Sequence, residues 1–145
     1  MRVSDILKAK GQAPVTTMAP GAAVTDAAQI LSKNKIGTVV VSADGRSPDG
    51  VVSERDIVRE LGRRGPSCLD DRLSDLMTRK VVTCAPTDDV SRVLEKMTEG
   101  RFRHMPVVDD GAMVGLVSLG DVVKAQLREV AAEKDALTDM IMGHG

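Results

Sequence analysis

The chain has 145 residues, of which 42% are hydrophobic and 28% charged, and its formal net charge at pH 7 is −1. This composition predicts a globular protein and excludes the broad basic field that favours nucleic acid or an anionic membrane. Two cysteines without zinc-ligand spacing exclude a metal site, and the absence of Trp and Tyr excludes the stacking platforms of single-strand nucleic-acid binders.

The N-terminal segment, MRVSDILKAK, has no apolar stretch resembling a signal peptide. No uninterrupted apolar run in the sequence reaches the length that crosses a bilayer. We therefore expect a cytoplasmic protein without membrane contact, in which Cys68 and Cys84 are reduced thiols.

The chain contains two copies of one pattern. The segment PVTTMAP, residues 14–20, returns as KVVTCAP, residues 80–86, so that Thr17 and Thr83 hold equivalent places 66 residues apart. Each copy continues with an apolar stripe at helical spacing. The stripes are Val24, Ala27, Ala28 and Leu31 in the first copy, and Val90, Val93, Leu94 and Met97 in the second.

An Asp-Gly pair, at residues 44–45 and 110–111, then separates two apolar runs in each copy and predicts a β-hairpin. Each copy therefore reads helix, strand, helix, strand, hairpin turn, strand, helix. The predicted fold class is α/β (α+β), with a first repeat over 1–64, a linker over 65–72, a second repeat over 73–130 and a C-terminal helix extension over 131–145. Because one repeat would be marginally stable alone, we expect the two to pack sheet to sheet around a shared core.

The last segment, residues 121–142, predicts a long helix with a seam of apolar residues that Lys134 interrupts. The seam consists of Val123, Leu127, Val130, Leu137 and Ile141. Two roles fit this pattern equally: the helix covers the core, or it pairs with the same helix of a second subunit. Of the eight methionines, we expect Met97, Met105 and Met113 to fill gaps in the core.

In both copies an apolar strand ends in Ser-x-x-Asp, at residues 53–56 and 118–121, and a helix begins at once. One interpretation is a helix cap alone, because a Ser followed by an acid three residues later satisfies free backbone N–H groups. The other is a ligand site, in which these N–H groups attract phosphate and the Asp accepts hydrogen bonds from ribose hydroxyls. Two copies at matching strand ends favour the ligand site.

These features resemble the CBS (cystathionine β-synthase) domain pairs over nearly the whole chain. In the second copy the resemblance lies in Val82-Thr83, in Met105-Pro106-Val107-Val108-Asp109 and in residues 115–121. It implies two β-α-β-β-α repeats related by a pseudo-two-fold axis, with Asp56 and Asp121 as ribose ligands and Ser53 and Ser118 on the phosphate side. It also implies that the adenine walls are Val15, Thr16 and Thr17 in one cleft, and Val81, Val82 and Thr83 in the other.

The two copies differ in charge, which predicts unequal clefts. Arg103 and His104 align with Gly37 and Thr38, whereas Arg55 aligns with Gly120. Ahead of the family-type pair Met105-Pro106, which we include in the site, Arg103 and His104 become candidate phosphate contacts. His104 is equally interpretable as a packed histidine. Arg55 fits a cleft or a solvated helix surface, and the sequence assigns it to neither.

The resemblance implies a regulatory, energy-sensing module that binds an adenine nucleotide, forms a homodimer and acts on an unidentified protein target. AMP is the first choice of ligand, and ADP, ATP, NAD(H) and S-adenosylmethionine share the same adenosine. No Ser or Cys has a motif-placed His and acid, and no GxxxxGK[ST] loop occurs, so we expect no enzyme activity. The alternative is a ligand-free interaction module that regulates a partner enzyme or transporter.

Overall fold

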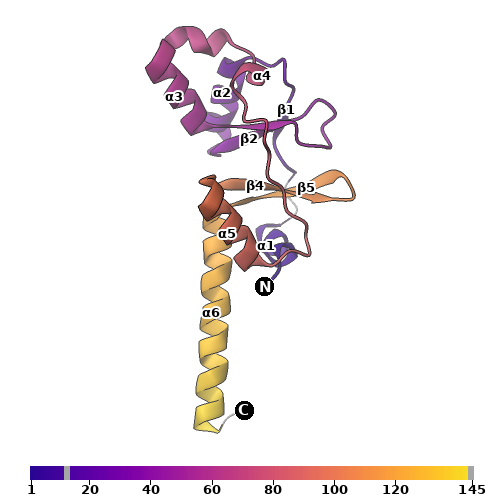
Figure 1. The fold of residues 1–145 in the computed structure, drawn as a ribbon, viewed down its shortest axis with the longest axis vertical. Coiled ribbons are helices and arrows are strands. Elements are labelled where there is room, and N and C mark those ends of the chain that lie inside the picture. Colours follow the sequence, from indigo (N-terminus) through magenta and orange to yellow (C-terminus); the bar gives the residue numbers. More distant parts are fainter. Residues whose placement is uncertain (12–13, 144–145) are drawn as a thin grey trace.

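The computed structural model describes residues 1–11 and 14–143 and contains two small sheets, one in each repeat (Figure 1). In the first repeat, β1 (Thr17–Met18) pairs in parallel with β2 (Thr38–Val41), and β2 pairs antiparallel with β3 (Gly50–Ser53). In the second repeat, β4 (His104–Asp109) pairs antiparallel with β5 (Ala112–Ser118). The mixed α and β composition agrees with the predicted fold class.

The helices occur where the apolar stripes predicted them. In both repeats the striped helix, α2 or α5, buries three of its four predicted residues and leaves Ala28 and Leu94 half-buried. Both end at a residue in the left-handed conformation, Lys35 with φ 53° and Arg101 with φ 56°. The helices are α1 (Val3–Lys10), α2 (Val24–Asn34), α3 (Glu54–Arg64), the 3-10 helix η1 (Pro66–Asp70), α4 (Leu73–Leu76), α5 (Val90–Gly100) and α6 (Leu119–Met142).

Strand register repeats the internal symmetry of the sequence. Met18 is the parallel partner of Val41, and 66 residues later Cys84 forms an isolated parallel bridge with Val107. The strand expected at Cys84 is reduced to this bridge. The backbone N–H of Val40 donates to the carbonyl of Thr16, but its equivalent Pro106 has no N–H with which to extend the pairing.

The two Asp-Gly hairpins are confirmed, and they differ in length. Asp110 and Gly111 both have positive φ, 52° and 77°, as a tight two-residue turn requires. The first hairpin has a longer loop, in which the Asp44 carboxylate accepts hydrogen bonds from the backbone N–H of Ser47 at 2.9 Å and of Arg46 at 2.8 Å. These hydrogen bonds hold the pKa of Asp44 well below its usual range.

The repeats exchange their leading helices. Helix α1, from the first repeat, places Val3 and Ile6 in the core cluster of the second, and α4, from the second repeat, places Leu73 in the core cluster of the first. Isolated β-bridges between Arg2 and Asp89 and between Ala23 and Arg72 connect the start of each exchanged helix to the repeat that receives it. The expected single shared core is therefore wrong, because the exchanged helices give each half a core of its own. The first cluster consists of Val24, Ala27, Leu31, Val39, Val41, Val52, Ile57 and Leu73, and the second of Val3, Ile6, Cys84, Val90, Val93, Met97, Met105, Val107, Val117, Val122 and Ala125.

Helix α6 covers the core only at its beginning. Val122 and Ala125 are buried in the second cluster, whereas Leu127, Leu137 and Ile141 are 63%, 58% and 76% exposed. Figure 1 shows the rest of the helix extending away from both sheets. The interpretation of this segment as a cover for the core is therefore wrong beyond the first turns. Within the described part of the chain, no helix combines the length and the apolar character needed to cross a membrane.

The helix exchange predicts that Leu73 stabilises a repeat to which it does not belong in sequence. Leu73 is completely buried, so Leu73→Ala should lower the free energy of unfolding by about 2–5 kcal/mol. As a control, Val58→Ala, at a side chain 66% exposed on α3, should change it by less than about 0.5 kcal/mol. Urea denaturation measures both, and equally small effects would contradict the exchange.

Candidate functional site

Each Ser-x-x-Asp motif caps the helix that it begins. At α3 the carboxylate of Asp56 accepts the backbone N–H of Ser53 at 2.8 Å and its hydroxyl at 2.9 Å, and the N–H of Asp56 donates to Ser53 Oγ at 3.2 Å. At α6 the N–H of Ser118 donates to Asp121 Oδ2 at 2.9 Å, and the N–H of Asp121 donates to Ser118 Oγ at 3.1 Å. The capping interpretation is therefore confirmed, and the question becomes what the two caps face.

The first of two clefts between the repeats has a volume of about 950 Å³, and we call it the Lys10 cleft. It joins the predicted adenine wall of the first repeat to the Ser118 cap of the second. Asp121 lies at its edge, where the ammonium of Lys10 contacts Asp121 Oδ2 at 2.8 Å and the carbonyl oxygen of Leu116 at 3.0 Å. The sequence-predicted residues that line this cleft are Val15, Thr16, Thr17, His104 and Ser118.

The second cleft has a volume of about 640 Å³, and we call it the Arg55 cleft. The two repeats exchange their roles in it. It joins the Ser53-Asp56 cap of the first repeat to the predicted adenine wall of the second. Arg59 contacts Asp56 Oδ1 at 2.7 Å within α3. The predicted residues that line this cleft are Ser53, Arg55, Asp56, Val81, Val82, Arg103, His104 and Pro106, which assigns Arg55 to a cleft.

Three predicted site residues, Thr83, Met105 and Asp121, line neither cleft, although Asp121 contacts the cleft residue Lys10. Met105 is completely buried in the second core cluster, because successive strand residues point to opposite faces and its neighbours His104 and Pro106 take the cleft side. Thr83 is half-buried and lines neither cleft. Among the expected core fillers, Met97 and Met105 lie in the core, whereas Met113 lines the Lys10 cleft.

Sequence reasoning missed several cleft residues. No residue near Lys10 in the sequence indicates that it lines a cleft, because only the helix exchange brings α1 to the second repeat. Lys80, Arg101 and Phe102 line the Arg55 cleft. Phe102, the only aromatic residue of the chain, therefore lies at that cleft.

A thin wall separates the clefts at the pseudo-two-fold axis. Three residues line both clefts: Gly37, Thr38 and His104. Thr38 Oγ1 and His104 Nδ1, which are equivalent positions of the two repeats, lie 2.9 Å apart and share a hydrogen bond. The His104 ring lies 3.4 Å from the point that a side chain at Gly37 would occupy, so the wall has little room for a larger residue there.

The electrostatics of the wall favour a neutral imidazole and a charged carboxylate. Burial lowers the pKa of His104, and Lys10 and Arg103 act in the same direction against the opposite effect of Asp121 and Glu54. Burial tends to raise the pKa of Asp121, but hydrogen bonds from Lys10 and Ser118 outweigh it and hold that pKa below its usual value. Beside the Lys10 cleft, the Asp121 carboxylate is therefore charged and paired with Lys10, whereas His104 in the cleft wall is uncharged at neutral pH. No group of three or more His, Cys, Asp or Glu side chains suited to a metal ion occurs among residues 1–11 and 14–143.

This arrangement of two repeats, two clefts between them and two Ser-x-x-Asp caps defines a class of tandem domain pairs. The CBS domain family matches the chain over residues 3–63 and 73–128, so the chain belongs to the CBS domain family. The matched ranges begin at α1 and at α4, the two helices that the repeats exchange.

Individual proteins extend the comparison. The CBS domain-containing protein CBSX3, mitochondrial, from Arabidopsis thaliana is 33% identical over 97% of this chain and 72% of its own. The crystal structure of the CBS-domain containing protein ATU1752 from Agrobacterium tumefaciens aligns with a TM-score of 0.82 and 39% identity over 87% of this chain and 99% of its own. The CBS domain protein PAE2072 from Pyrobaculum aerophilum, complexed with AMP, aligns with a TM-score of 0.77 and 31% identity over 91% of this chain and 99% of its own.

The environment of His104 predicts an imidazole that titrates below its usual value of 6.5. The unfolded chain therefore binds a proton at His104 more readily than the folded chain does. The stability that neutral His104 contributes to the folded state is complete above pH 6.5, and it is lost as the pH falls toward the lower pKa of the folded state. An NMR titration of the two histidine signals, assigned with His104→Asn, measures the shift. In the variant the stability should vary less with pH below about 6.5. A His104 signal that titrates at or above the usual value would contradict the prediction.

Proposed function

We propose that this chain is a non-catalytic regulatory module that binds an adenine nucleotide in the two clefts between its CBS repeats. The Arg55 cleft carries the proposal, because it combines a Ser-x-x-Asp helix start from one repeat with the predicted adenine wall of the other. The structural neighbour complexed with AMP supports an adenosine-type ligand. We place the protein in the cytoplasm, and AMP remains the first choice among AMP, ADP, ATP, NAD(H) and S-adenosylmethionine.

In the Arg55 cleft, the ribose hydroxyls donate to the Asp56 carboxylate and the base lies against Val81 and Val82. The carboxylate already forms an ion pair with Arg59, whose side chain is 65% exposed and is therefore free to turn toward the phosphate. Ser53 remains at the helix start, where backbone N–H groups and the helix dipole favour an anion. One ligand thus contacts both repeats.

In the Lys10 cleft, the ribose competes with Lys10 for Asp121. Lys10 Nζ contacts Asp121 Oδ2, whereas Asp121 Oδ1 accepts no hydrogen bond from the described residues. A ribose hydroxyl donates to this second oxygen first, and the ammonium then moves toward the phosphate of the ligand. Because Lys10 belongs to α1, occupation of this cleft acts directly on a helix exchanged between the repeats. A displaced helix is a signal that a target protein can read.

Replacing the two aspartates by asparagine separates binding from capping. Asp56→Asn and Asp121→Asn keep an oxygen that accepts the backbone N–H of the cap but remove the charge that holds the ribose. Each should weaken AMP binding in its own cleft by about 1.5–3 kcal/mol per charge-assisted hydrogen bond. Each should change the free energy of unfolding by less than about 1 kcal/mol. Titration calorimetry and thermal melts measure the two effects.

Asp75→Asn is the matched control, because Asp75 caps α4 by accepting the backbone N–H of Arg72 at 3.1 Å and lines neither cleft. It should leave AMP affinity unchanged. If all three variants bind AMP as the wild type does, the motifs are caps only. A wild-type protein that binds neither AMP nor adenosine would favour the ligand-free interaction module.

We also propose that the protein forms a homodimer through α6. The exposed seam of this helix has the spacing of a heptad repeat, with Lys134 at one core position. In a parallel pair of helices, a side chain at a core position packs beside the residue that precedes the same position in the partner helix. Lys134 of one copy therefore lies against Glu133 of the other copy. Opposite charges thus meet where the apolar seam is interrupted. The seam is Val123, Leu127, Val130, Leu137 and Ile141, each at least 39% exposed.

Light scattering at micromolar concentration should give twice the mass of one chain. Leu137→Glu should shift the protein toward the monomer, because it places a charge in the middle of the seam. Ala132→Glu adds the same charge to the opposite face of the same helix and should leave the dimer intact. A wild-type monomer, both with and without AMP, would refute the dimer.

A further inference from the structure

The Arg55 cleft gathers positive charge in a chain whose net charge is −1. Five cationic side chains line it against two carboxylates, those of Glu54 and Asp56, which leaves a formal charge of +3. The cations come from three separate segments, so no single helix face accounts for them. They are Arg55 and Arg59 on α3, Lys80 before the adenine wall, and Arg101 and Arg103 between α5 and β4.

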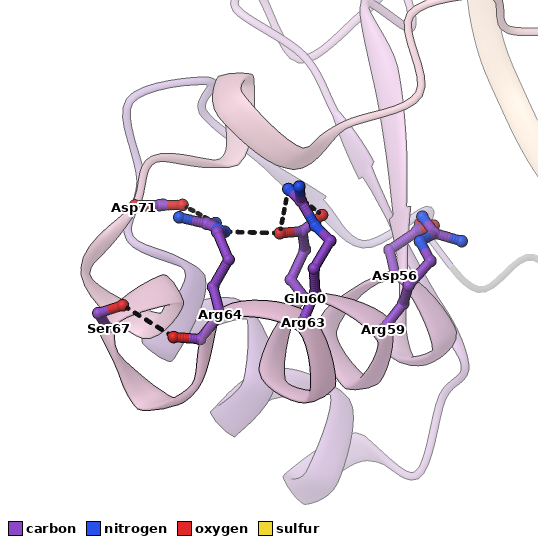
Figure 2. Close-up of polar contacts among 7 residues, drawn as sticks. All are labelled: Asp56, Arg59, Glu60, Arg63, Arg64, Ser67 and Asp71. Atoms are coloured by element: carbon purple, nitrogen blue, oxygen red, sulfur yellow. Dashed lines mark hydrogen bonds and ion pairs between the residues drawn. The ribbon is translucent and has the colours of Figure 1, made fainter.

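Most of these cations have no counter-charge. Arg59 pairs with Asp56, but none of the other four forms an ion pair with a residue that the structure describes. The other arginines of helix α3 lie beside acidic side chains (Figure 2). Its remaining arginines, Arg63 and Arg64, contact Glu60 at 3.0 and 2.7 Å, and Arg64 also contacts Asp71. Arg55, which lines the cleft together with Arg59, is the one arginine of α3 that lacks an acidic partner among the described residues.

The duplication supplies an internal comparison. The equivalents of the five cationic positions in the other repeat are Pro14, Lys35, Gly37, Gly120 and Lys124. Only two of these are cationic, and neither lines the Lys10 cleft. That cleft has two cations, Lys8 and Lys10, against Asp109, and Lys10 is already paired with Asp121. The same scaffold therefore concentrates positive charge on one side of the wall only.

An array of unpaired cations around one cleft attracts an anion of several charges. Guanidinium groups bind phosphate oxygens through paired N–H donors, so each further phosphate group finds further partners. We propose that the Arg55 cleft selects adenosine carrying two or more linked phosphates, whereas the Lys10 cleft takes a nucleoside or monophosphate. This rests on the proposed function and adds the ligand class of each cleft. Arg59 is paired with Asp56 before a ligand enters, and the four unpaired cations are available to the phosphate chain from the outset.

Titration calorimetry in the Asp121→Asn background, which weakens the Lys10 cleft, isolates the Arg55 cleft. ATP without Mg²⁺ should bind at least about tenfold more tightly than AMP, and ADP should lie between them. Raising the salt concentration from 50 to 200 mM should weaken ATP binding more than AMP binding, because the larger ligand charge is screened more.

NAD⁺ tests whether a diphosphate between two nucleosides is accepted as well. If NAD⁺ binds as tightly as ADP, the cleft reads the diphosphate; if it binds only as AMP does, the cleft requires a terminal phosphate.

The double variant Arg55→Gln with Arg103→Gln removes one unpaired arginine from each repeat. Both side chains are exposed, so the fold should persist, and the preference for ATP over AMP should fall to about threefold or less. Arg92→Gln with Arg128→Gln is the matched control, since it removes the same charge from exposed sites outside both clefts. The control should keep the full preference.

Three results would overturn the inference: equal binding of AMP and ATP to the parent protein, a preference that survives the double variant, or a control that loses the preference equally. The last would mean that overall charge, rather than the cleft, selects the ligand. Failure of the proposed function is distinguishable from these results, because AMP, ADP and ATP would then all leave the wild-type protein without a binding signal.

Discussion

The exchange of the leading helices is the constraint on which the rest of this structure depends. A repeat of about sixty residues would be marginally stable alone, and here each repeat closes its core with a helix supplied by the other. The same exchange brings Lys10 to Asp121. Each cleft is lined by residues of both repeats, so the clefts exist only where the two repeats pack together.

The internal symmetry explains both the likeness of the two clefts and their difference. Position for position, the caps of α3 and α6 match, and Thr38 meets its own equivalent, His104, at the axis. The backbone scaffold is thus shared, while the side chains on either side of the wall have diverged. A duplicated scaffold with unequal charge can report on two ligands, or on two concentration ranges of one ligand. Because His104 and Thr38 line both clefts, the two clefts share part of their walls.

The features that sequence reasoning recovered are those encoded locally. The helical stripes, the Asp-Gly turns and the Ser-x-x-Asp caps each depend on residues within a few positions of one another, so the secondary structure followed from the pattern. The site residues came from the family resemblance, and most of those predicted line a cleft. Features that depend on long-range placement did not follow from the local pattern. Nothing near Lys10 or Leu73 indicates that their helices cross to the other repeat. The inward orientation of Met105 could have been found from strand alternation, and the missing N–H of Pro106 already accounts for the shortened strand at Cys84.

The geometry of α6 gives the molecule a mechanical property. The helix begins at the Ser118–Asp121 cap beside the Lys10 cleft and continues without interruption for 24 residues, which is a rod about 36 Å long. Its base is held by Val122 and Ala125 in the second core, whereas its far end is exposed. A tilt of about 5° at the cap, too small to disturb the core, moves the far end of a rod of that length by about 3 Å. The length of the helix thus magnifies a small tilt at the Ser118–Asp121 cap into a larger displacement at its far end.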